Sequence, residues 1–232
     1  MAIVVMPFKR IIFDIETIGK DFESLEQPIQ DYLLRWADTE EKEEEIKERL
    51  GLYPLTGEIV AIGLLDPDTA KGKVYFQAPL SDPFLPFEEN GIWYEAGTEE
   101  EILNKFWNEI KDYDQIITFN GRGFDCPFIL IRSALYRIKP SKEIMPNRYN
   151  NSHTDLLDQL TFYGITRKYS LDIWCRFFGI TSPKEEGITG LQVKELFMKG
   201  QYMEIARYCA RDLIATKKLF EYWDQYIRFR ND

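Results

Sequence analysis

Hydrophobic and polar positions divide the chain into segments of strand length and segments of helix length. Apolar and β-branched runs predict strands at 8–16, 58–66 and 74–78, and a short buried strand at 116–120. The turn sequence PDTAKGK separates the second strand from the third, so we expect the first three strands to form an antiparallel meander. The segment 80–91 is rich in proline and turn residues and is expected to be a loop.

Helical periodicity occupies much of the remaining chain. Thr98, with Glu101 three residues later, forms a capping-box pattern, and the apolar stripe that follows predicts a helix. Pro127 near the start of FDCPFILIRSALYRI is typical of a first helical turn, where a missing N–H costs little. The charged stretch EEKEEEIKERL, at the end of the segment 22–50, is expected to be a solvated helix with Glu–Lys pairs. Further helices are predicted before Gly164, before Gly179 and over 201–227.

The composition indicates one folded domain without a membrane segment. Hydrophobic residues make up 44% and aromatic residues 15% of the 232 positions, which is enough for a substantial core. No apolar run reaches the roughly 20 residues that span a bilayer. The opening MAIVVMPFKRIIF is interrupted by basic residues, so we interpret it as the approach to a first strand and not as a signal peptide. Because no repeat or linker divides the chain, one domain is expected over 1–232.

The few cysteines and the single histidine exclude several kinds of site. Cys126, Cys175 and Cys209 are odd in number and widely spaced, which argues against a zinc site or a disulfide framework and indicates a reducing, cytoplasmic setting. His153 is the only histidine, so most catalytic triads and most zinc enzymes are excluded.

The net charge of −10 counts against nucleic-acid binding, whose usual mark is a basic face. Two considerations weaken this objection. A site made of carboxylates adds negative charge that bound divalent cations offset locally. A protein that holds one strand end also needs fewer phosphate contacts than one that wraps a duplex.

Asp14 and Glu16 end the first predicted strand. Alternate residues of a strand face the same side, about 6.6 Å apart along its axis, so both carboxylates can converge on one hard cation. Burying two uncompensated carboxylates is costly, so a cation or another partner is needed. The alternative is that the strand has ended and both acids are solvated turn residues.

Asp125 follows the strand at 116–120 in the sequence N-G-R-G-F-D, where Gly121 and Gly123 permit a sharp turn or a close approach to a ligand. The alternative role for Asp125 is the N-cap of the next helix. A glycine-rich nucleotide-binding loop is disfavoured because the third glycine of G-x-G-x-x-G falls at Cys126.

Tyr208 and Asp212 are four residues apart in the last predicted helix, so they lie on one face of it. This face borders the apolar stripe of the helix, and Asp212 therefore falls at the margin of the buried side, where an acid needs a base or a metal. The alternative is a structural tyrosine with Asp212 paired to Arg211. The stripe itself consists of Ile205, Cys209, Leu213 and Phe220.

The three carboxylate segments occur in an order that resembles a known superfamily. I-F-D-I-E-T (12–17), N-G-R-G-F-D (120–125) and Y-C-A-R-D (208–212) are similar to the motifs of the DEDD 3′–5′ exonucleases. The last motif matches the tyrosine subclass, because the histidine subclass has His at the position of Arg207. The chain most resembles stand-alone exonucleases related to the proofreading domain of family B DNA polymerases. The likeness extends over nearly the whole chain and includes the segments 54–63, 153–158 and 169–172. Residues 20–50 are the least similar part.

The resemblance implies an α/β fold of the ribonuclease-H-like type, with a central mixed sheet of about five strands flanked by helices. It also implies a nuclease module without a polymerase region, acting on the 3′ end of nucleic acid. Single-stranded DNA is favoured as substrate and RNA is possible.

The resemblance further implies two divalent cations, Mg²⁺ or Mn²⁺, which suit oxygen-only ligands. Asp14 would bridge both cations, and Glu16 and Asp212 would complete the hydrolytic site. Asp125 would hold the second cation, and Tyr208 would orient the attacking water. With an ordinary pKa near 10, this tyrosine is not expected to act as a full base at neutral pH.

Three residues are candidates for contact with the terminal nucleotide: Thr17 with its sugar, Asn120 by hydrogen bonding and Phe124 by stacking. Thr17 can equally be a plain strand-end residue, and Phe124 can equally belong to the core. Arg122 is a candidate for phosphate contact, and Asp155 is interpreted as a cap or a supporting residue.

Two other functions remain open. A ribonuclease that trims RNA 3′ ends would use the same carboxylates. A ribonuclease-H-like binding module with a decayed site is the alternative from another class, and the presence of all four acids and the tyrosine argues against it.

Overall fold

The structure is a computed structural model that describes residues 8–79, 85–182 and 192–229. Its strands are β1 (Arg10–Gly19), β2 (Gly57–Leu65), β3 (Gly72–Gln77), β4 (Phe87–Glu89), β5 (Ile92–Gly97), β6 (Gln115–Thr118) and β7 (His153–Asp155). Its α-helices are α1 (Gln27–Leu34), α2 (Glu40–Glu48), α3 (Glu99–Ile110), α4 (Asp125–Leu135), α5 (Leu156–Leu160), α6 (Leu171–Phe177), α7 (Val193–Met198) and α8 (Tyr202–Tyr226). Two 3₁₀ turns, η1 (Phe22–Ser24) and η2 (Arg49–Leu52), lie between β1 and β2.

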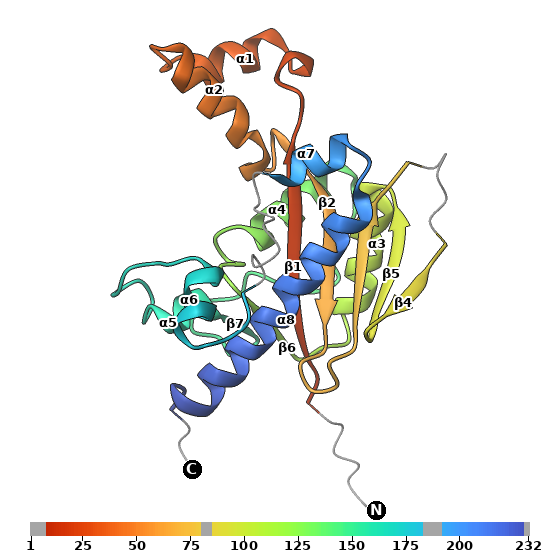
Figure 1. The fold of residues 1–232 in the computed structure, drawn as a ribbon, viewed down its shortest axis with the longest axis vertical. Helices are drawn as coiled ribbons and strands as arrows, with labels where there is room; N and C mark the ends of the chain where they lie inside the picture. The colour runs from red at the N-terminus through yellow and green to blue at the C-terminus, as the bar shows by residue number, and fades with distance from the viewer. Residues whose placement is uncertain (1–7, 80–84, 183–191, 230–232) are drawn as a thin grey trace, which may run out of the picture.

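The strands form one mixed sheet in the order β4-β5-β3-β2-β1-β6-β7 (Figure 1). β1, β2 and β3 pair antiparallel, as the predicted meander requires. β6 joins the other side of β1 in parallel, and β7 joins β6 in parallel. The expected mixed sheet flanked by helices is therefore confirmed, with β1 near its centre.

The sheet has seven strands and not about five, and β4, β5 and β7 lie outside the four predicted strand ranges. The loop expected at 80–91 lies partly outside the described residues, but its later part forms β4. Asn90 and Gly91 both have positive φ, at 53° and 81°, and make the two-residue turn of a hairpin with β5. An Asn-Gly pair is a strong hairpin signal, so this strand pair was readable from the sequence. β7 has only three residues, too few for a periodic pattern.

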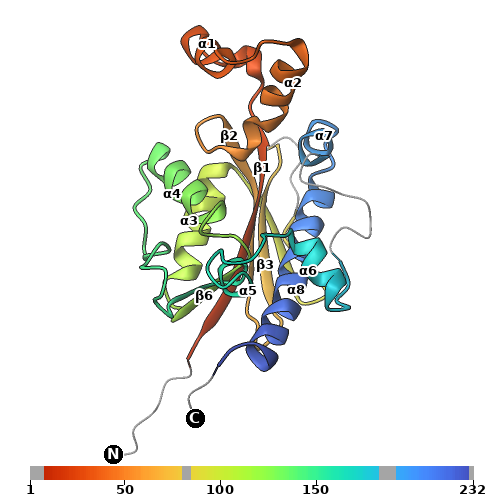
Figure 2. The ribbon, with the colours of Figure 1, turned by 90° about the vertical axis from the view of Figure 1, so that its left-hand side faces the viewer.

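Helices cover both faces of the sheet (Figure 2). α8 packs over one face with a cluster that includes Ile12 and Ile18 of β1. α3 and α4 pack over the other face with Phe13 and Ile15. Because side chains alternate along a strand, the even-numbered residues of β1 between Ile12 and Ile18 face α8.

The helix predictions agree with the structure at their main signals. Thr98 and Glu101 form the capping box that begins α3. Gly164 and Gly179, after α5 and α6, have φ of 91° and 68°, the left-handed conformation that ends a helix. Pro127 lies in the first turn of α4. None of the described helices has the length and apolar character that crossing a bilayer requires.

Residues 21–52, which we call the arm, project from the end of β1 as a small helical unit (Figures 1 and 2). The charged stretch forms α2, capped by Thr39, as predicted. The Thr17 hydroxyl donates a hydrogen bond of 2.7 Å to the carbonyl of Gly51, and thereby ties the arm to β1. A Cβ on Gly19 would lie 2.8 Å from the nitrogen of Gly51, so the two backbones meet where no side chain fits.

Candidate metal centre

Asp14 and Glu16 lie on the side of β1 that faces α8, as the strand period predicted. A carboxylate oxygen of each and the Cys209 sulfur lie within 4.8 Å of one another. Glu16 is only 6% exposed, and Asp14 is half-buried. The alternative of two solvated turn residues is therefore wrong, since β1 continues to Gly19.

Gly63 of β2 allows α8 to approach these acids. It pairs with Asp14 across the sheet. A Cβ on Gly63 would lie 2.6 Å from Cδ1 of Leu213 and 2.8 Å from the Cys209 sulfur, so the helix rests directly on the glycine. The Cys209 thiol in turn points to the carbonyl of Asp14 at 3.8 Å. The sequence analysis did not single out Gly63, although a glycine inside the strand pattern EIVAIGLL is a sign of close approach.

α8 carries Tyr208 and Asp212 on the side that borders its buried stripe. Tyr208 is 4% exposed and Asp212 is half-buried, which places the acid at the margin of the core as predicted. The Arg211 guanidinium lies 5.8 Å from the centre of the Tyr208 ring.

Asp125 reaches the same region from the other side of β1. It is 3% exposed and is the first residue of α4, after the cap residue Phe124. Its Oδ1 accepts a hydrogen bond of 3.0 Å from the backbone N–H of Ile15, between the two acids of β1. Asp125 is thus not the N-cap of α4.

The turn between β6 and α4 depends on its glycines, as expected. A Cβ on Gly121 would lie 2.4 Å from Oγ1 of Thr118, and one on Gly123 would lie 2.6 Å from Oδ1 of Asn120. Asn120 itself has a φ of 61°, a left-handed conformation that asparagine tolerates better than most residues. Only glycines fit at 121 and 123 in a turn this tight.

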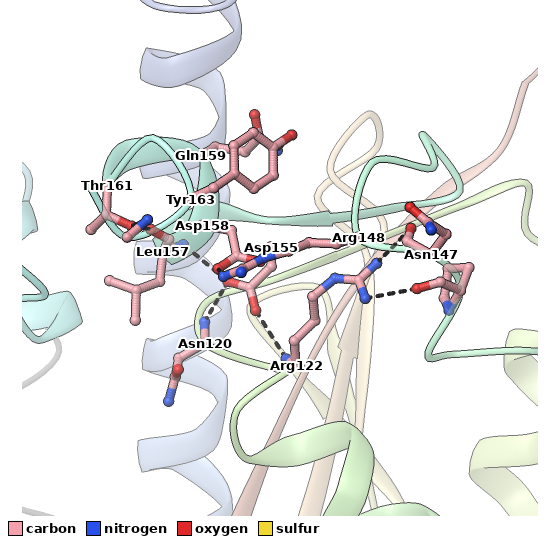
Figure 3. Close-up of polar contacts among 12 residues, drawn as sticks. Asn120, Arg122, Asn147, Arg148, Asp155, Leu157, Asp158, Gln159, Thr161 and Tyr163 are labelled. Atoms are coloured by element: carbon pink, nitrogen blue, oxygen red, sulfur yellow. Dashed lines mark hydrogen bonds and ion pairs between the residues drawn. The ribbon is translucent and has the colours of Figure 1, made fainter. Parts of the chain in front are cut away.

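Asp155 holds this turn in place (Figure 3). Its Oδ1 accepts from the backbone N–H of Asn120 at 2.9 Å and from that of Leu157 at 3.0 Å. Its Oδ2 accepts from the backbone N–H of Arg122 at 2.9 Å. The predicted cap role is confirmed at Leu157, and the grip on the turn before Asp125 was not foreseen.

The side chains of Arg122 and His153 hold neighbouring segments of the chain together. The Arg122 guanidinium donates to the carbonyls of Pro146 at 2.8 Å and Asn147 at 3.4 Å (Figure 3). This guanidinium, the candidate for phosphate contact, is therefore bonded to the backbone of its own chain. The His153 ring lies between Oγ1 of Thr118 at 2.9 Å and the carbonyl of Ile144 at 3.0 Å. Burial lowers the pKa of His153 to about 4, so the ring is neutral and structural at neutral pH.

The acids raise one another's pKa because they are buried together. Burial, and then the charges of Asp125, Asp212 and Glu16, hold the pKa of Asp14 well above its ordinary value. Burial raises the pKa of Asp125 to about 7, although the hydrogen bond from Ile15 opposes the shift. Carboxylates that influence each other in this way form one cluster, which a cation stabilises.

Tyr208 belongs to the same electrostatic cluster. Burial, followed by the charges of Asp212 and Glu16, raises the pKa of its hydroxyl. The tyrosine is therefore protonated at every physiological pH, and its hydroxyl is available as a hydrogen-bond donor.

The donor set fits a hard divalent cation such as Mg²⁺ or Mn²⁺. The acids offer carboxylate oxygens, the ligands that such ions prefer. Cys209 lies within the cluster, but burial and the nearby acids raise the pKa of its thiol far above the usual value, so it offers no thiolate. Cys126 is fully buried and burial raises the pKa of its thiol, so it is a small core residue that offers no thiolate.

The proposed nucleotide contacts lie around the cluster. Thr17 is occupied by its hydrogen bond to Gly51. Phe124 packs against Phe128, with 5.5 Å between the ring centres, and so contributes to the core. Asn120 lies in the turn held by Asp155.

The ribonuclease-H-like fold and its buried carboxylates define the class of the protein, a 3′–5′ exonuclease. Residues 90–229 match the family described as predicted 3′-5′ exonuclease related to the exonuclease domain of PolB, and residues 4–159 match the exonuclease domain of DNA polymerase family B. Each match covers more than half of the chain. The chain belongs to this family of exonucleases related to the exonuclease domain of PolB.

Two polymerases show the extent of the likeness. A DNA polymerase of Methanocaldococcus jannaschii is 27% identical over 132 residues, which are 50% of this chain and 8% of the polymerase. The family B DNA polymerase of Pyrobaculum calidifontis shares the fold, with a TM-score of 0.59 and 17% identity over 94% of this chain and 25% of that one. The chain thus spans a small part of either polymerase.

Proposed function

We propose that the chain removes nucleotides from the 3′ end of single-stranded DNA, with two divalent cations held by Asp14, Glu16, Asp125 and Asp212. The observation that carries this proposal is the burial of these acids in one cluster where β1, α4 and α8 meet. Such a cluster is unfavourable by itself and becomes stable when cations bind. When bound, the cations would activate the attacking water and stabilise the leaving oxygen.

Asp14 lies at the centre of the proposed cation site. The charges of the other three acids all act on Asp14, which suits it to be the shared ligand. Glu16 lies beside it on β1, and Asp125 reaches it from α4. The backbone of Ile15 fixes the orientation of Asp125, so that this carboxylate is already aligned before cations arrive.

Tyr208 supports assignment to the tyrosine subclass. Its protonated hydroxyl can orient the attacking water by donating or sharing a hydrogen bond, but it cannot remove a proton at neutral pH. The preceding position, where the other subclass carries histidine, is Arg207, and its Nε donates to Glu89 of β4 at 3.0 Å. The tyrosine therefore fills the water-orienting role in this chain.

DNA is the favoured substrate because both related proteins are DNA polymerases. A 3′-trimming ribonuclease is the alternative, since the same acids serve either sugar. The experiment uses 5′-labelled single strands of DNA and RNA of one sequence, with Mg²⁺, with Mn²⁺ and with a chelator. We expect a ladder of products shortened from the 3′ end of the DNA, dependent on the cation.

Asp14→Ala and Asp212→Ala should abolish the ladder, and Asp112→Ala, an exposed acid elsewhere, should leave it intact. Full activity of Asp14→Ala would refute the metal-site assignment. Faster cleavage of RNA than of DNA would identify RNA as the substrate. No cleavage of either strand would favour a binding module.

A further inference from the structure

The two helices of the arm have no core of their own. Neither α1 nor α2 contributes a buried side chain. The buried side chains of the arm belong to its two 3₁₀ turns at the base, namely Phe22 of η1 and Leu50 of η2. Short helices gain most of their stability from packing an apolar face against another surface. Apolar side chains of the arm and of the segment that follows it stay largely accessible: Trp36 and Leu55 are each 78% exposed.

These side chains line a groove of about 580 Å³ between α1, α2 and the segment before β2. Its apolar lining consists of Leu33, Trp36, Ile46, Leu50, Tyr53 and Leu55. Lys42 and Ile46 of α2 and its C-cap residue Arg49 are three to four residues apart, so they line the groove from one side of the helix. An apolar groove beside a helix can receive the apolar face of another amphipathic helix.

The charge of the arm restricts what can bind there. Residues 21–52 contain eleven acidic and four basic residues, a net charge of −7 out of −10 for the whole chain. The basic residues at the groove are already engaged on the arm. Lys42 pairs with Asp38 at 2.5 Å, and Arg49 pairs with Glu45 at 3.1 Å. The potential around the groove is therefore negative, which repels a phosphate backbone and attracts basic side chains.

We propose that the arm groove is a docking site for a basic amphipathic helix of a partner protein. Apolar residues of this helix enter the groove against Trp36 and Leu55, and its lysines or arginines lie along the acidic rim. Trp36 is the expected anchor, because a large aromatic side chain in an apolar groove supplies most of the binding energy in such interfaces. The arm is tied to β1 by the hydrogen bond from Thr17 to Gly51, so a partner bound there stays attached to the nuclease.

The test measures binding of a fluorescently labelled 18-residue peptide, with leucine and lysine at helical spacing, to the full chain by anisotropy. We expect saturable binding that weakens as salt increases, because the rim charges are exposed. Three probes serve as controls: a scrambled leucine–lysine peptide, a leucine–glutamate peptide of the same pattern, and a labelled single-stranded oligonucleotide. None of these should bind the groove.

Matched variants locate the binding. Trp36→Ala should weaken binding of the leucine–lysine peptide roughly tenfold, and Phe177→Ala, a side chain 77% exposed on α6, should not. Glu41→Lys with Glu48→Lys should weaken it further, and Glu100→Lys with Asp112→Lys should not. All four residues are exposed. Nuclease activity should be retained in every one of these variants.

Three results would overturn the proposal. The leucine–lysine peptide fails to bind, or it binds the Trp36→Ala and Phe177→Ala variants equally well. In the third result, Trp36→Ala weakens binding of the oligonucleotide and changes the lengths of the cleavage products relative to the wild type. The groove would then be a path for the substrate strand.

Discussion

The Oδ1 atom of Asp125 accepts a hydrogen bond of 3.0 Å from the backbone N–H of Ile15, and this contact joins the second acidic motif directly to the first. The Asp125 carboxylate has two proposed roles, as acceptor of this hydrogen bond and as a charged ligand of the cation. An amide can replace the acceptor but not the charge. We expect Asp125→Asn to fold with nearly normal stability and to lose nuclease activity. Asp125→Ala should lose the activity and also cost about 1–3 kcal/mol of unfolding free energy, because a buried N–H is left without an acceptor.

Urea unfolding and the strand-cleavage assay check this prediction on the same samples. Equal destabilisation by Asp125→Asn and Asp125→Ala would show that the hydrogen bond to Ile15 contributes nothing.

Gly63 sets the distance between α8 and the acids of β1. Gly63→Ala places a methyl group against Leu213 and Cys209, and Gly63→Val adds two more carbons. We expect a cost of about 1–3 kcal/mol from overpacking, and a loss of activity even well below the unfolding temperature, because Asp212 moves with its helix. The check is a double-mutant cycle with Leu213→Ala. If the two substitutions add without coupling, α8 does not rest on this glycine.

Asp155 positions the turn that leads to Asp125, and its charge also raises the pKa of Asp125. Asp155→Ala should lower activity about tenfold or more, because the backbone N–H groups of Asn120 and Arg122 lose their acceptor. Asp158→Ala is the matched control, since this neighbouring buried acid pairs with Arg148 and not with the turn. Asp155→Asn should restore part of the activity. Equal losses in Asp155→Ala and Asp158→Ala would reduce the role of Asp155 to general stability.

The strand period and the helix period predicted which acids share a face, and the order of the three motifs, which resembles that of the DEDD exonucleases, singled out Asp14, Glu16 and Asp212 as a candidate site. Each of these placements depends on residues two or four positions apart. Gly63 and Asp155 act across long separations: Gly63 on α8 and Asp155 on the turn after β6. A local pattern marks such residues at most as a glycine within a strand or a cap before a helix, and it does not show their distant partners. For this reason Asp155 was interpreted as a cap or supporting residue without its contact to the turn, and Gly63 was not singled out.

The need for contacts between distant parts of the chain also explains why outer strands of the sheet were missed. The net charge is a separate case. β7 has three residues, too few to show a period, and pairing with β6 makes it a strand. β4 is equally short, and only the Asn90-Gly91 turn before β5 marked it in the sequence. The net charge of −10 argued against a nucleic-acid partner only while its location was unknown. With −7 of it in the residues 21–52, the rest of the chain is close to neutral.

Tyr208 should contribute by orientation and not by proton transfer. Tyr208→Phe removes a protonated hydroxyl from a buried position, so we expect activity to fall by about ten- to a hundredfold, far less than in Asp14→Ala. The pH profile of the remaining activity should keep its shape, because burial and the neighbouring acids raise the pKa of this hydroxyl out of the working range. A profile that loses its alkaline limb in Tyr208→Phe would instead assign the tyrosine a titrating role.

His153 should make the fold sensitive to acid. Burial lowers its pKa to about 4 in the folded protein, compared with about 6.5 in the unfolded chain. Between these values the unfolded state binds a proton that the folded state does not, so stability falls as the pH decreases from 6.5 to 4. The shift corresponds to about 3 kcal/mol at the lower end. His153→Gln, which can bond to Thr118 and Ile144 without titrating, isolates this contribution. Urea unfolding of both proteins from pH 8 to pH 4.5 should show the wild type losing stability relative to the variant only below pH 6.5. Parallel curves would mean that the ring is protonated in the folded state, and the single histidine resonance in an NMR titration would then move near pH 6.5.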